Sequence, residues 1–106
     1  AVLTVGDLTI DPGRRAVLQG GQELPLTSVE FSVLEVLMTQ AGRVVSREEL
    51  CSQALGRQLN SYDRSIDVHI SSLRRKLGPA KDGSERLKSV RGVGYIYLRP
   101  VLEDAV

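Results

Sequence analysis

The spacing of apolar residues changes twice along this chain, and this change limits the folds open to it. The first part consists of short extended stretches separated by turns: Val2–Val5, Leu8–Ile10, Ala16–Gln19 and Glu23–Leu24. Asp11-Pro12-Gly13 and Gly20-Gly21 favour tight turns, because Gly reaches positive φ and Pro presets φ. Apolar residues then recur at helical spacing, and from Leu87 they alternate again. The sequence therefore predicts a small antiparallel sheet, then helices, then a hairpin.

Two capping boxes mark the starts of the first two predicted helices. Thr27-Ser28-Val29-Glu30 and Ser46-Arg47-Glu48-Glu49 each place a hydroxyl residue three positions before a glutamate. That spacing lets the two side chains satisfy each other's backbone N–H groups. The first helix is predicted to end at Gly42, and the second to run to Leu55 with Gly56 as its stop.

The third predicted helix is the most informative segment. It begins between Ser61 and Arg64 and ends at Gly78-Pro79. Ile66, Ile70, Leu73 and Leu77 fall within about 60° of one another on a helix, so they form one buried stripe. The opposite face carries Ser61, Arg64, Ser65, Val68, Ser72 and Arg75, with His69 and Lys76 on one flank and Ser71 on the other. The exposed face therefore carries small side chains in its middle and basic side chains at its edge.

The end of the chain predicts a β-hairpin with an arginine at its tip. Leu87–Val90 and Tyr95–Leu98 are short alternating strands, and the turn between them is Arg91-Gly92-Val93-Gly94.

The net charge of +1 conceals an uneven distribution. Residues 57–91 hold nine Lys and Arg against four Asp and Glu, whereas residues 1–56 hold four against seven. A concentration of positive charge in one third of a 106-residue chain favours a polyanionic partner.

Several functional classes lack the residues they need. One Cys and one His cannot form an intrachain disulfide or a four-ligand zinc site. His69 is the only histidine and lies in an Arg-rich helix, and Arg91-Gly92-Val93-Gly94 lacks the Lys-Ser/Thr of a phosphate-binding loop. No apolar run approaches the roughly 18 residues of a membrane span, and the start does not resemble a signal peptide. We expect a cytoplasmic, non-enzymatic domain without metal or cofactor and with no membrane contact.

The third predicted helix and the hairpin have the features that sequence-specific DNA binding requires. A helix in the major groove needs a narrow outer face near the base edges and positive charge at its margins. Ser65, Val68 and Ser72 are short enough for base contacts, and Val68 suits a thymine methyl group. Phosphate contacts are expected from Arg64, His69, Arg74 and Arg75. Arg91 at the hairpin tip suits a narrow minor groove.

Each of these residues also has a plain structural interpretation. Val68 is also consistent with an isolated apolar residue on the surface, and Ser71, Ser72 and His69 with ordinary solvent-facing positions. Arg91 is also consistent with an ion pair to a neighbouring carboxylate. Their collection on one helix face and one hairpin favours the DNA-binding interpretation.

Five stretches carry a family resemblance: Leu26-Thr27 with Glu30-Phe31, Gly42 through Val45-Ser46-Arg47-Glu48 to Leu50, Asp63–Ile70, Leu73–Leu77 and Val90–Tyr95. Over about residues 3–99 the chain resembles the C-terminal winged-helix DNA-binding domain of OmpR/PhoB-type response regulators. Within this family, Gly56–Leu59, Asp63–Leu77 and Lys81-Asp82-Gly83 are most similar to the envelope-stress regulators.

The resemblance implies an α+β winged helix-turn-helix domain over residues 1–106, with a four-stranded N-terminal antiparallel sheet, three helices and a C-terminal hairpin as the wing. By position, it implies that bases are contacted by Ser65, Val68 and Ser72, and that phosphates are contacted by Arg64, His69, Ser71 and Arg74. It places Ser89, Arg91 and Tyr95 on the wing, with Arg91 in the minor groove and Ser89 and Tyr95 at phosphates. The Gly56–Tyr62 loop, with Arg57, Gln58 and Asn60, resembles a segment that some family activators present to RNA polymerase.

Three departures from the family pattern qualify this picture. Ser71 and Ser72 stand where some members carry Arg, which favours an A·T-leaning site because Arg–guanine pairs are the commonest specific contacts. Leu55 replaces a Trp found in several relatives. The sequence holds no receiver domain, so we interpret the chain as an excised effector domain, and no Asp here is expected to be a phosphorylation site.

The expected function is sequence-specific binding of double-stranded DNA to regulate transcription, as the output domain of a two-component response regulator. The resemblance implies that two copies bind head to tail on direct repeats, and that a cognate sensor kinase acts only through the missing receiver. Two alternatives remain: a winged helix that docks on an acidic protein, and the cytoplasmic part of a membrane-anchored winged-helix regulator.

Overall fold

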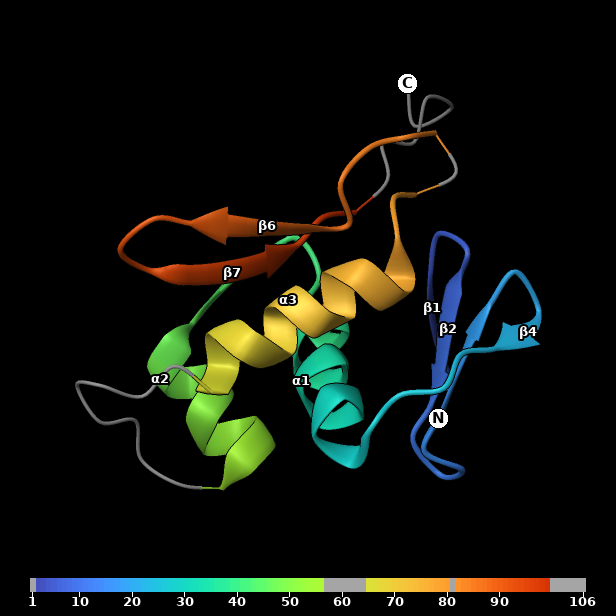
Figure 1. Ribbon diagram of the computed structural model, residues 1–106, viewed down its shortest axis with the longest axis horizontal. Helices are drawn as coiled ribbons and strands as arrows, with labels where there is room; N and C mark the ends of the chain where they lie inside the picture. Colours follow the sequence, from blue (N-terminus) through green and yellow to red (C-terminus); the bar gives the residue numbers. More distant parts are fainter. Residues whose placement is uncertain (1, 57–64, 81, 100–106) are drawn as a thin grey trace.

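The N-terminal part of the chain forms a four-stranded antiparallel sheet (Figure 1). The computed structural model describes residues 2–56, 65–80 and 82–99. The strands β1 (Leu3–Val5), β2 (Leu8–Asp11), β3 (Ala16–Gln19) and β4 (Gln22–Glu23) follow one another in sequence order across the sheet. Gly20 and Gly21 form the last turn with φ of 58° and 86°, which few residues other than glycine tolerate. The predicted meander is confirmed.

The first two helices begin at the predicted signals, but the first ends at Thr39, with Gln40 as its C-cap, before the predicted stop at Gly42. The predicted start of the third helix, between Ser61 and Arg64, lies outside the described residues. Helix α1 (Ser28–Thr39) starts with the complete capping box, in which the Thr27 hydroxyl accepts from the Glu30 N–H at 3.2 Å and the Glu30 carboxylate accepts from the Thr27 N–H at 3.0 Å. Helix α2 (Arg47–Leu50) continues through the π-helical turn η1 (Cys51–Leu55) and stops at Gly56. At its start the Ser46 hydroxyl accepts from the Glu49 N–H at 3.0 Å.

A second sheet contains a strand that the sequence did not predict. The hairpin strands β6 (Leu87–Val90) and β7 (Gly94–Tyr97) pair as expected, but β7 also pairs with β5 (Val44–Ser46), giving the order β5-β7-β6. Three residues between a glycine and a helix carry too little alternation to predict a strand. The partner of β5 lies about 50 residues later in the chain, so only the tertiary fold reveals the pairing.

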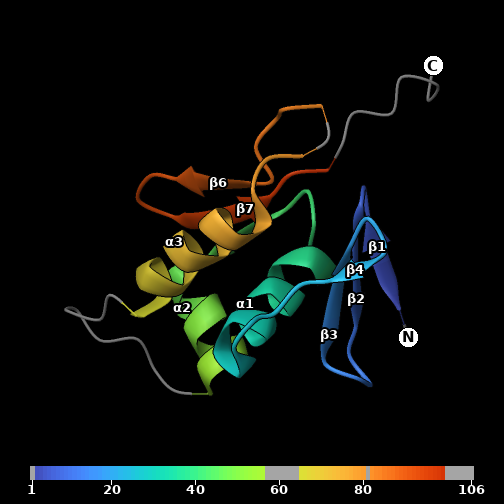
Figure 2. The same cartoon turned by 45° about the vertical axis from the view of Figure 1, so that its right-hand side comes forward.

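Helix α3 (Ser65–Leu77) lies across α1, with the hairpin on its other side (Figures 1 and 2). The predicted stripe of Ile66, Ile70, Leu73 and Leu77 is buried, with no residue more than 3% exposed. It joins the apolar side of α1, which contributes Phe31, Leu34, Leu37 and Met38 to the same core. The architecture is a winged helix, and the buried stripe fixes which face of α3 is presented to the outside.

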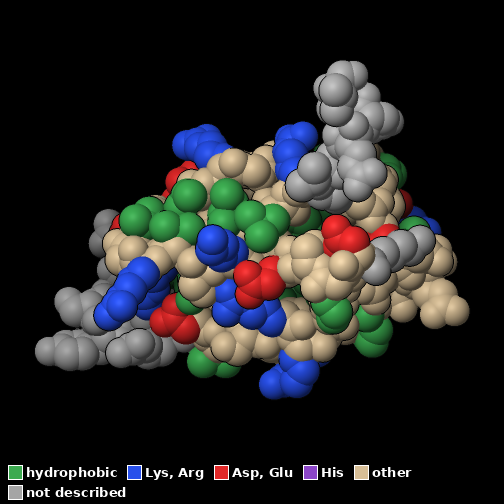
Figure 3. Space-filling view, turned by 90° about the horizontal axis from the view of Figure 1, so that it is seen from above, with side chains coloured by type: hydrophobic (Ala, Val, Ile, Leu, Met, Phe, Trp, Pro, Cys, Tyr) green, Lys and Arg blue, Asp and Glu red, His purple; other side chains and the backbone are tan. Residues whose placement is uncertain are grey.

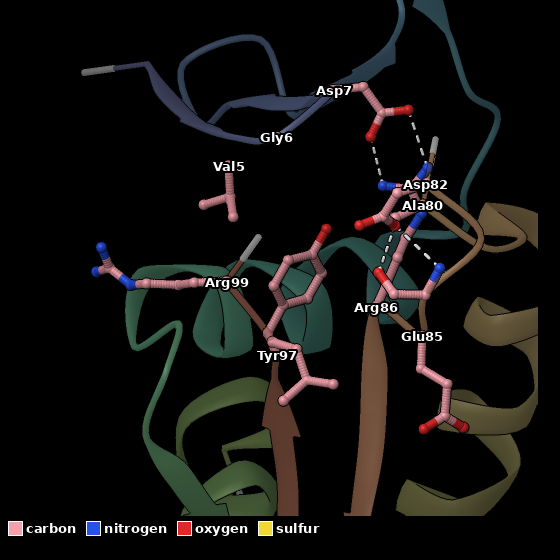
Figure 4. Close-up of a pocket in the computed structure, with 11 residues that line it drawn as sticks. Val5, Gly6, Asp7, Ala80, Asp82, Glu85, Arg86, Tyr97 and Arg99 are labelled. Carbon is pink, nitrogen blue, oxygen red and sulfur yellow. Dashed lines mark hydrogen bonds and ion pairs between the residues drawn. The ribbon is translucent and has the colours of Figure 1, made fainter. Parts of the chain in front are cut away.

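A buried arginine ties the N-terminal sheet to the end of α3 (Figure 4). The guanidinium of Arg86 forms a two-pronged ion pair with Asp7, with 3.0 Å between Nη2 and Oδ2. It also donates from Nε to the Gly78 carbonyl and from Nη2 to the Pro79 carbonyl, both at 3.0 Å. Donating hydrogen bonds to the Asp7 carboxylate raises the pKa of Arg86 against the opposing effect of burial. Arg86 therefore fixes the sheet, the C-terminus of α3 and β6 relative to one another.

Within the described ranges, no helix combines the length and the apolar character that crossing a bilayer requires.

Candidate nucleic-acid interface

The outer face of α3 is a shallow depression with an apolar residue in its middle. Val68 is 62% exposed although it lies on a helix whose other aliphatic residues are buried. His69, Ser71, Ser72 and Arg75 line the depression with it, and Glu30 of α1 forms part of its wall. The arrangement matches the predicted face, with short side chains in the middle and an exposed arginine at the margin.

Glu30 is the centre of a polar network beneath this face. Its side chain is almost fully buried, and its Oε1 accepts from the ammonium of Lys76 at 2.6 Å. Its Oε2 accepts from the hydroxyl of Ser72. Burial raises the pKa of Glu30, but hydrogen bonds from Lys76, Ser72 and the Thr27 backbone outweigh it and lower the pKa to about 2. The carboxylate is therefore ionised throughout the physiological range.

This network predicts an acid-sensitive contribution to stability. Because the folded pKa of Glu30 lies below the ordinary value of 4.5, its stabilising effect is complete above pH 4.5 and is lost as pH falls towards 2. The contribution amounts to about 3 kcal/mol of unfolding free energy. We expect unfolding titrations between pH 5 and 2 to show a steeper loss for the wild type than for Glu30→Gln.

Glu23→Gln is the matched control, since Glu23 is exposed on β4. Its stability should follow the wild type across the same pH range. Parallel curves for the wild type and Glu30→Gln would contradict the assignment of the acid-sensitive contribution to Glu30.

A second carboxylate couples α3 to the hairpin and to α2. Asp67 accepts from Arg47 at 3.0 Å between Nη2 and Oδ2, and its other oxygen accepts from the Tyr95 hydroxyl. Burial and the hydrogen bond to Asp67 raise the pKa of Tyr95 to about 12, so its hydroxyl keeps its proton. Arg74 extends the link, donating to the Ser89 hydroxyl at 2.8 Å with its guanidinium 5.8 Å from the Tyr95 ring centroid. These contacts fix the position of the wing relative to α3.

The wing presents one arginine at its turn. Arg91 is exposed, precedes Gly92 with φ of 77°, and makes no ion pair with any residue that the structure describes. The outer face of the β5-β7-β6 sheet carries a band of apolar side chains with Lys and Arg around it (Figure 3). Val44 and Ile96 are partly exposed register neighbours in this sheet, and Val93 at the turn is 50% exposed. Positive charge thus lies at the wing tip, beside an apolar surface.

The structure brings most of the predicted residues together and leaves some untested. Four of the predicted residues lie outside the described part of the chain: Arg57, Gln58, Asn60 and Arg64. Ser65, Val68, His69, Ser71, Ser72, Arg74 and Arg75 all lie on α3, and Ser89, Arg91 and Tyr95 lie on the wing. Three of these side chains already donate within the protein: the hydroxyls of Ser72 and Tyr95 donate to carboxylates, and Arg74 donates to Ser89.

Sequence reasoning missed the two carboxylates that organise the site. The sequence assigns Glu30 to a capping box and to the family resemblance but to no contact with α3, and it assigns no role to Asp67. Their partners lie far along the chain: 42 residues separate Glu30 from Ser72, and 28 separate Asp67 from Tyr95. Local spacing gives no signal for such contacts.

A hollow larger than the depression on α3 lies elsewhere, between the β1–β2 turn and the chain that follows α3 (Figure 4). It has a volume of about 590 Å3, and Asp7, Arg86 and Tyr97 form part of its lining. All three guanidinium nitrogens of Arg86 already have protein partners there. The polar end of this hollow therefore has a structural explanation.

The fold and this face define a class of protein. The family described as transcriptional regulatory protein, C terminal, matches residues 21–97. The chain belongs to this family, and it is a winged-helix effector domain of the OmpR/PhoB type.

Individual relatives agree with this assignment. The transcriptional regulatory protein CpxR of Escherichia coli K12 is 48% identical over 94 residues, which cover 89% of this chain and 40% of CpxR. BasR of the same organism is 42% identical over the same shares of both chains. The chain thus spans about 40% of the length of the curated relatives that it matches.

Solved structures give the same result. The DNA-binding domain of CpxR from E. coli has a TM-score of 0.91 and 44% identity, covering 95% of this chain and 99% of that one. The DNA-binding domain of RstA from Klebsiella pneumoniae, solved in complex with the RstA box, has a TM-score of 0.82 and 38% identity, with 92% and 96% covered. The similarity to CpxR agrees with the subgroup that the sequence indicated.

Proposed function

We propose that this domain binds double-stranded DNA in a sequence-specific manner and regulates transcription as the output domain of a response regulator. One observation carries the proposal: α3 is held by a fully buried apolar stripe, and its opposite face exposes Val68 among short polar residues with Arg75 at the margin. Such a face fits the major groove. The similarity to an RstA domain solved with its DNA box supports the same conclusion.

The proposed contacts fall into two groups. Ser65, Val68 and Ser72 meet base edges, and Arg91 enters the minor groove. His69, Ser71, Arg74, Arg75 and Ser89 meet phosphates, as does Arg64 of the predicted helix start. Tyr95 stays a predicted phosphate contact, but its hydroxyl must leave Asp67 before it can donate to a phosphate, which only accepts hydrogen bonds.

Assembly and partners extend this proposal to the whole protein. Residues 1–106 form one winged-helix domain, and two copies bind direct repeats about 10–10.5 bp apart. Pairing through a phosphorylated receiver domain raises avidity without new DNA contacts, and a sensor kinase acts through that receiver. The segment with Arg57, Gln58 and Asn60 contacts RNA polymerase.

The test is selection of bound molecules from randomised duplex DNA by this domain at two salt concentrations, followed by sequencing. We expect an enriched direct repeat with one helical turn between its halves, and affinity that falls as salt rises. Salt-sensitive binding without any enriched sequence would overturn sequence-specific recognition. That result would instead favour a winged helix that docks on an acidic protein.

Val68→Ala should alter recognition without altering stability. Val68 is 62% exposed, so we expect its loss to change the unfolding free energy by less than about 0.5 kcal/mol. Loss of contact with one thymine methyl should reduce discrimination at that base pair by about 1 kcal/mol, or roughly fivefold. Binding isotherms on the selected site, a uracil-substituted site and random DNA measure this. A uniform loss on all three would contradict the assigned contact.

Arg91→Ala should weaken binding and reduce the preference for A·T pairs at the flank of the site. Narrow A·T minor grooves concentrate negative potential, so the guanidinium gains most there. The slope of log K against the logarithm of salt concentration should become shallower by about one, because one phosphate contact fewer releases about one counterion fewer. Arg14→Ala is the control, because Arg14 is exposed in the turn between β2 and β3 and belongs to neither α3 nor the wing. An unchanged flank preference in Arg91→Ala would remove Arg91 from the minor groove.

A further inference from the structure

The hydrogen bond between Ser72 and Glu30 has a defined direction. The Ser72 hydroxyl donates to Glu30 Oε2, while Glu30 Oε1 accepts from the Thr27 N–H at 3.0 Å and from Lys76 at 2.6 Å. Glu30 is 4% exposed and carries its negative charge at neutral pH, so it only accepts hydrogen bonds. Each carboxylate oxygen therefore has its own set of donors, and the proton of Ser72 points into the protein.

This direction limits what Ser72 presents to the outside. A serine hydroxyl has one proton and two acceptor lone pairs. With the proton committed to Glu30, only lone pairs remain for a group in the depression that Ser72 and Glu30 both line. Rotating the proton outward would take a charge-assisted donor from a buried carboxylate oxygen, which is unfavourable.

We propose that Glu30 is a specificity-determining positioning residue that makes Ser72 a reader of hydrogen-bond donors alone. This inference rests on the proposed DNA-binding function. In the major groove, the adenine N6 and cytosine N4 amino groups donate, whereas guanine O6 and N7 and thymine O4 only accept. The base that faces Ser72 is therefore adenine or cytosine, and guanine or thymine at that position leaves two acceptors facing each other.

Glu30→Gln tests this inference, because the capping box fixes which position the amide oxygen takes and which position the amide nitrogen takes. The position of Oε1 receives two donors, the Thr27 N–H and Lys76, so the amide oxygen belongs there. The amide NH2 then faces Ser72 and donates to it, which frees the serine proton to point outward. Glutamine also keeps the capping box. The substitution should thus reverse the hydrogen-bond direction of Ser72 with little change in shape.

The experiment is site selection with the wild type, Ser72→Ala, Glu30→Gln and the double variant. Ser72→Ala identifies the base pair read by Ser72, since the preference should vanish there alone. At that pair, Glu30→Gln should lower the preference for adenine or cytosine over guanine or thymine on the order of fivefold. The double variant should match Ser72→Ala. Glu35→Gln, a substitution on the same helix away from Ser72, should retain the wild-type preference.

A second measurement uses the wild-type protein and does not depend on the folding of Glu30→Gln. The exocyclic amine of the base facing Ser72 is deleted, for example by replacing adenine with purine. Affinity should fall severalfold for the wild type and stay unchanged for Ser72→Ala.

The outcomes distinguish a failure of the proposed DNA-binding function from a failure of the inference about Glu30. If the wild type enriches no sequence, the proposed function fails. If a site is enriched but Ser72→Ala changes no position, or the facing base is guanine or thymine, the inference about Glu30 is overturned and the proposed function stands. The same holds if a folded Glu30→Gln keeps the wild-type preference at that position.

Discussion

Replacing Gly94 with alanine is expected to destabilise the domain by about 3 kcal/mol or more. Gly94 opens β7 opposite Ser46 of β5, and the two backbones approach closely there. A methyl group on Gly94 would overlap the Val45 carbonyl oxygen and lie 2.8 Å from the Ser46 Cα. Both groups belong to the backbone, so no side-chain rotation relieves the overlap and β5 must separate from β7.

Urea unfolding of the wild type and Gly94→Ala measures this effect. Gly13→Ala is the matched control, because a methyl group there meets only the Asp11 carboxylate at an ordinary 3.5 Å. That control should change stability by less than about 1 kcal/mol. A loss in Gly94→Ala no larger than in Gly13→Ala would show that β5 and β7 separate without cost.

Arg86→Met is the second substitution with a large expected effect, a loss of about 3–5 kcal/mol. Arg86 is 6% exposed, and its guanidinium holds the Asp7 carboxylate together with the Gly78 and Pro79 carbonyls. Methionine has a similar apolar stem but donates no hydrogen bond. The buried carboxylate of Asp7 then loses its guanidinium partner, which costs more than the ion pair itself contributes.

The double variant Asp7→Leu/Arg86→Met separates these causes, since removing both charges leaves no carboxylate that has lost its guanidinium partner. We expect thermal and urea unfolding to show a smaller loss for the double variant than for Arg86→Met, with part of the loss remaining from the two carbonyls. Arg14→Met, at an exposed arginine, should change stability by less than about 0.5 kcal/mol. Equal stabilities of Arg86→Met and Arg14→Met would show that the buried ion pair is not needed.

Both substitutions affect how the wing is held rather than the contacts it makes. Gly94 lets β7 pair with β5, and Arg86 fixes the residue before β6 to the end of α3. We therefore expect each variant to weaken DNA binding in proportion to its loss of folded protein. Variants at Val68 and Arg91 should instead change binding with folding intact.

The candidate interface was predictable where one helix face defines it. Val68, Ser71 and Arg75 followed from the position of the buried stripe, because 100° per residue assigns each of them to the outer side. The hydrogen-bonded state of Ser72 did not follow, since its partner lies on another helix. Residues can thus be placed on a face from the sequence, but the direction of their hydrogen bonds cannot.

The sequence by itself determined the local elements: the turns of the first sheet, the capping box at Thr27, the amphipathic α3 and the hairpin around Gly92. Each depends on backbone preferences or on side chains only a few residues apart. Only the tertiary structure decided the pairing of β5 with β7, the burial of Arg86 with Asp7, and the carboxylate networks of Glu30 and Asp67. Apart from the local capping contact of Glu30, these contacts join residues from 20 to 79 positions apart, and their strength comes from burial that exists only once the core has closed.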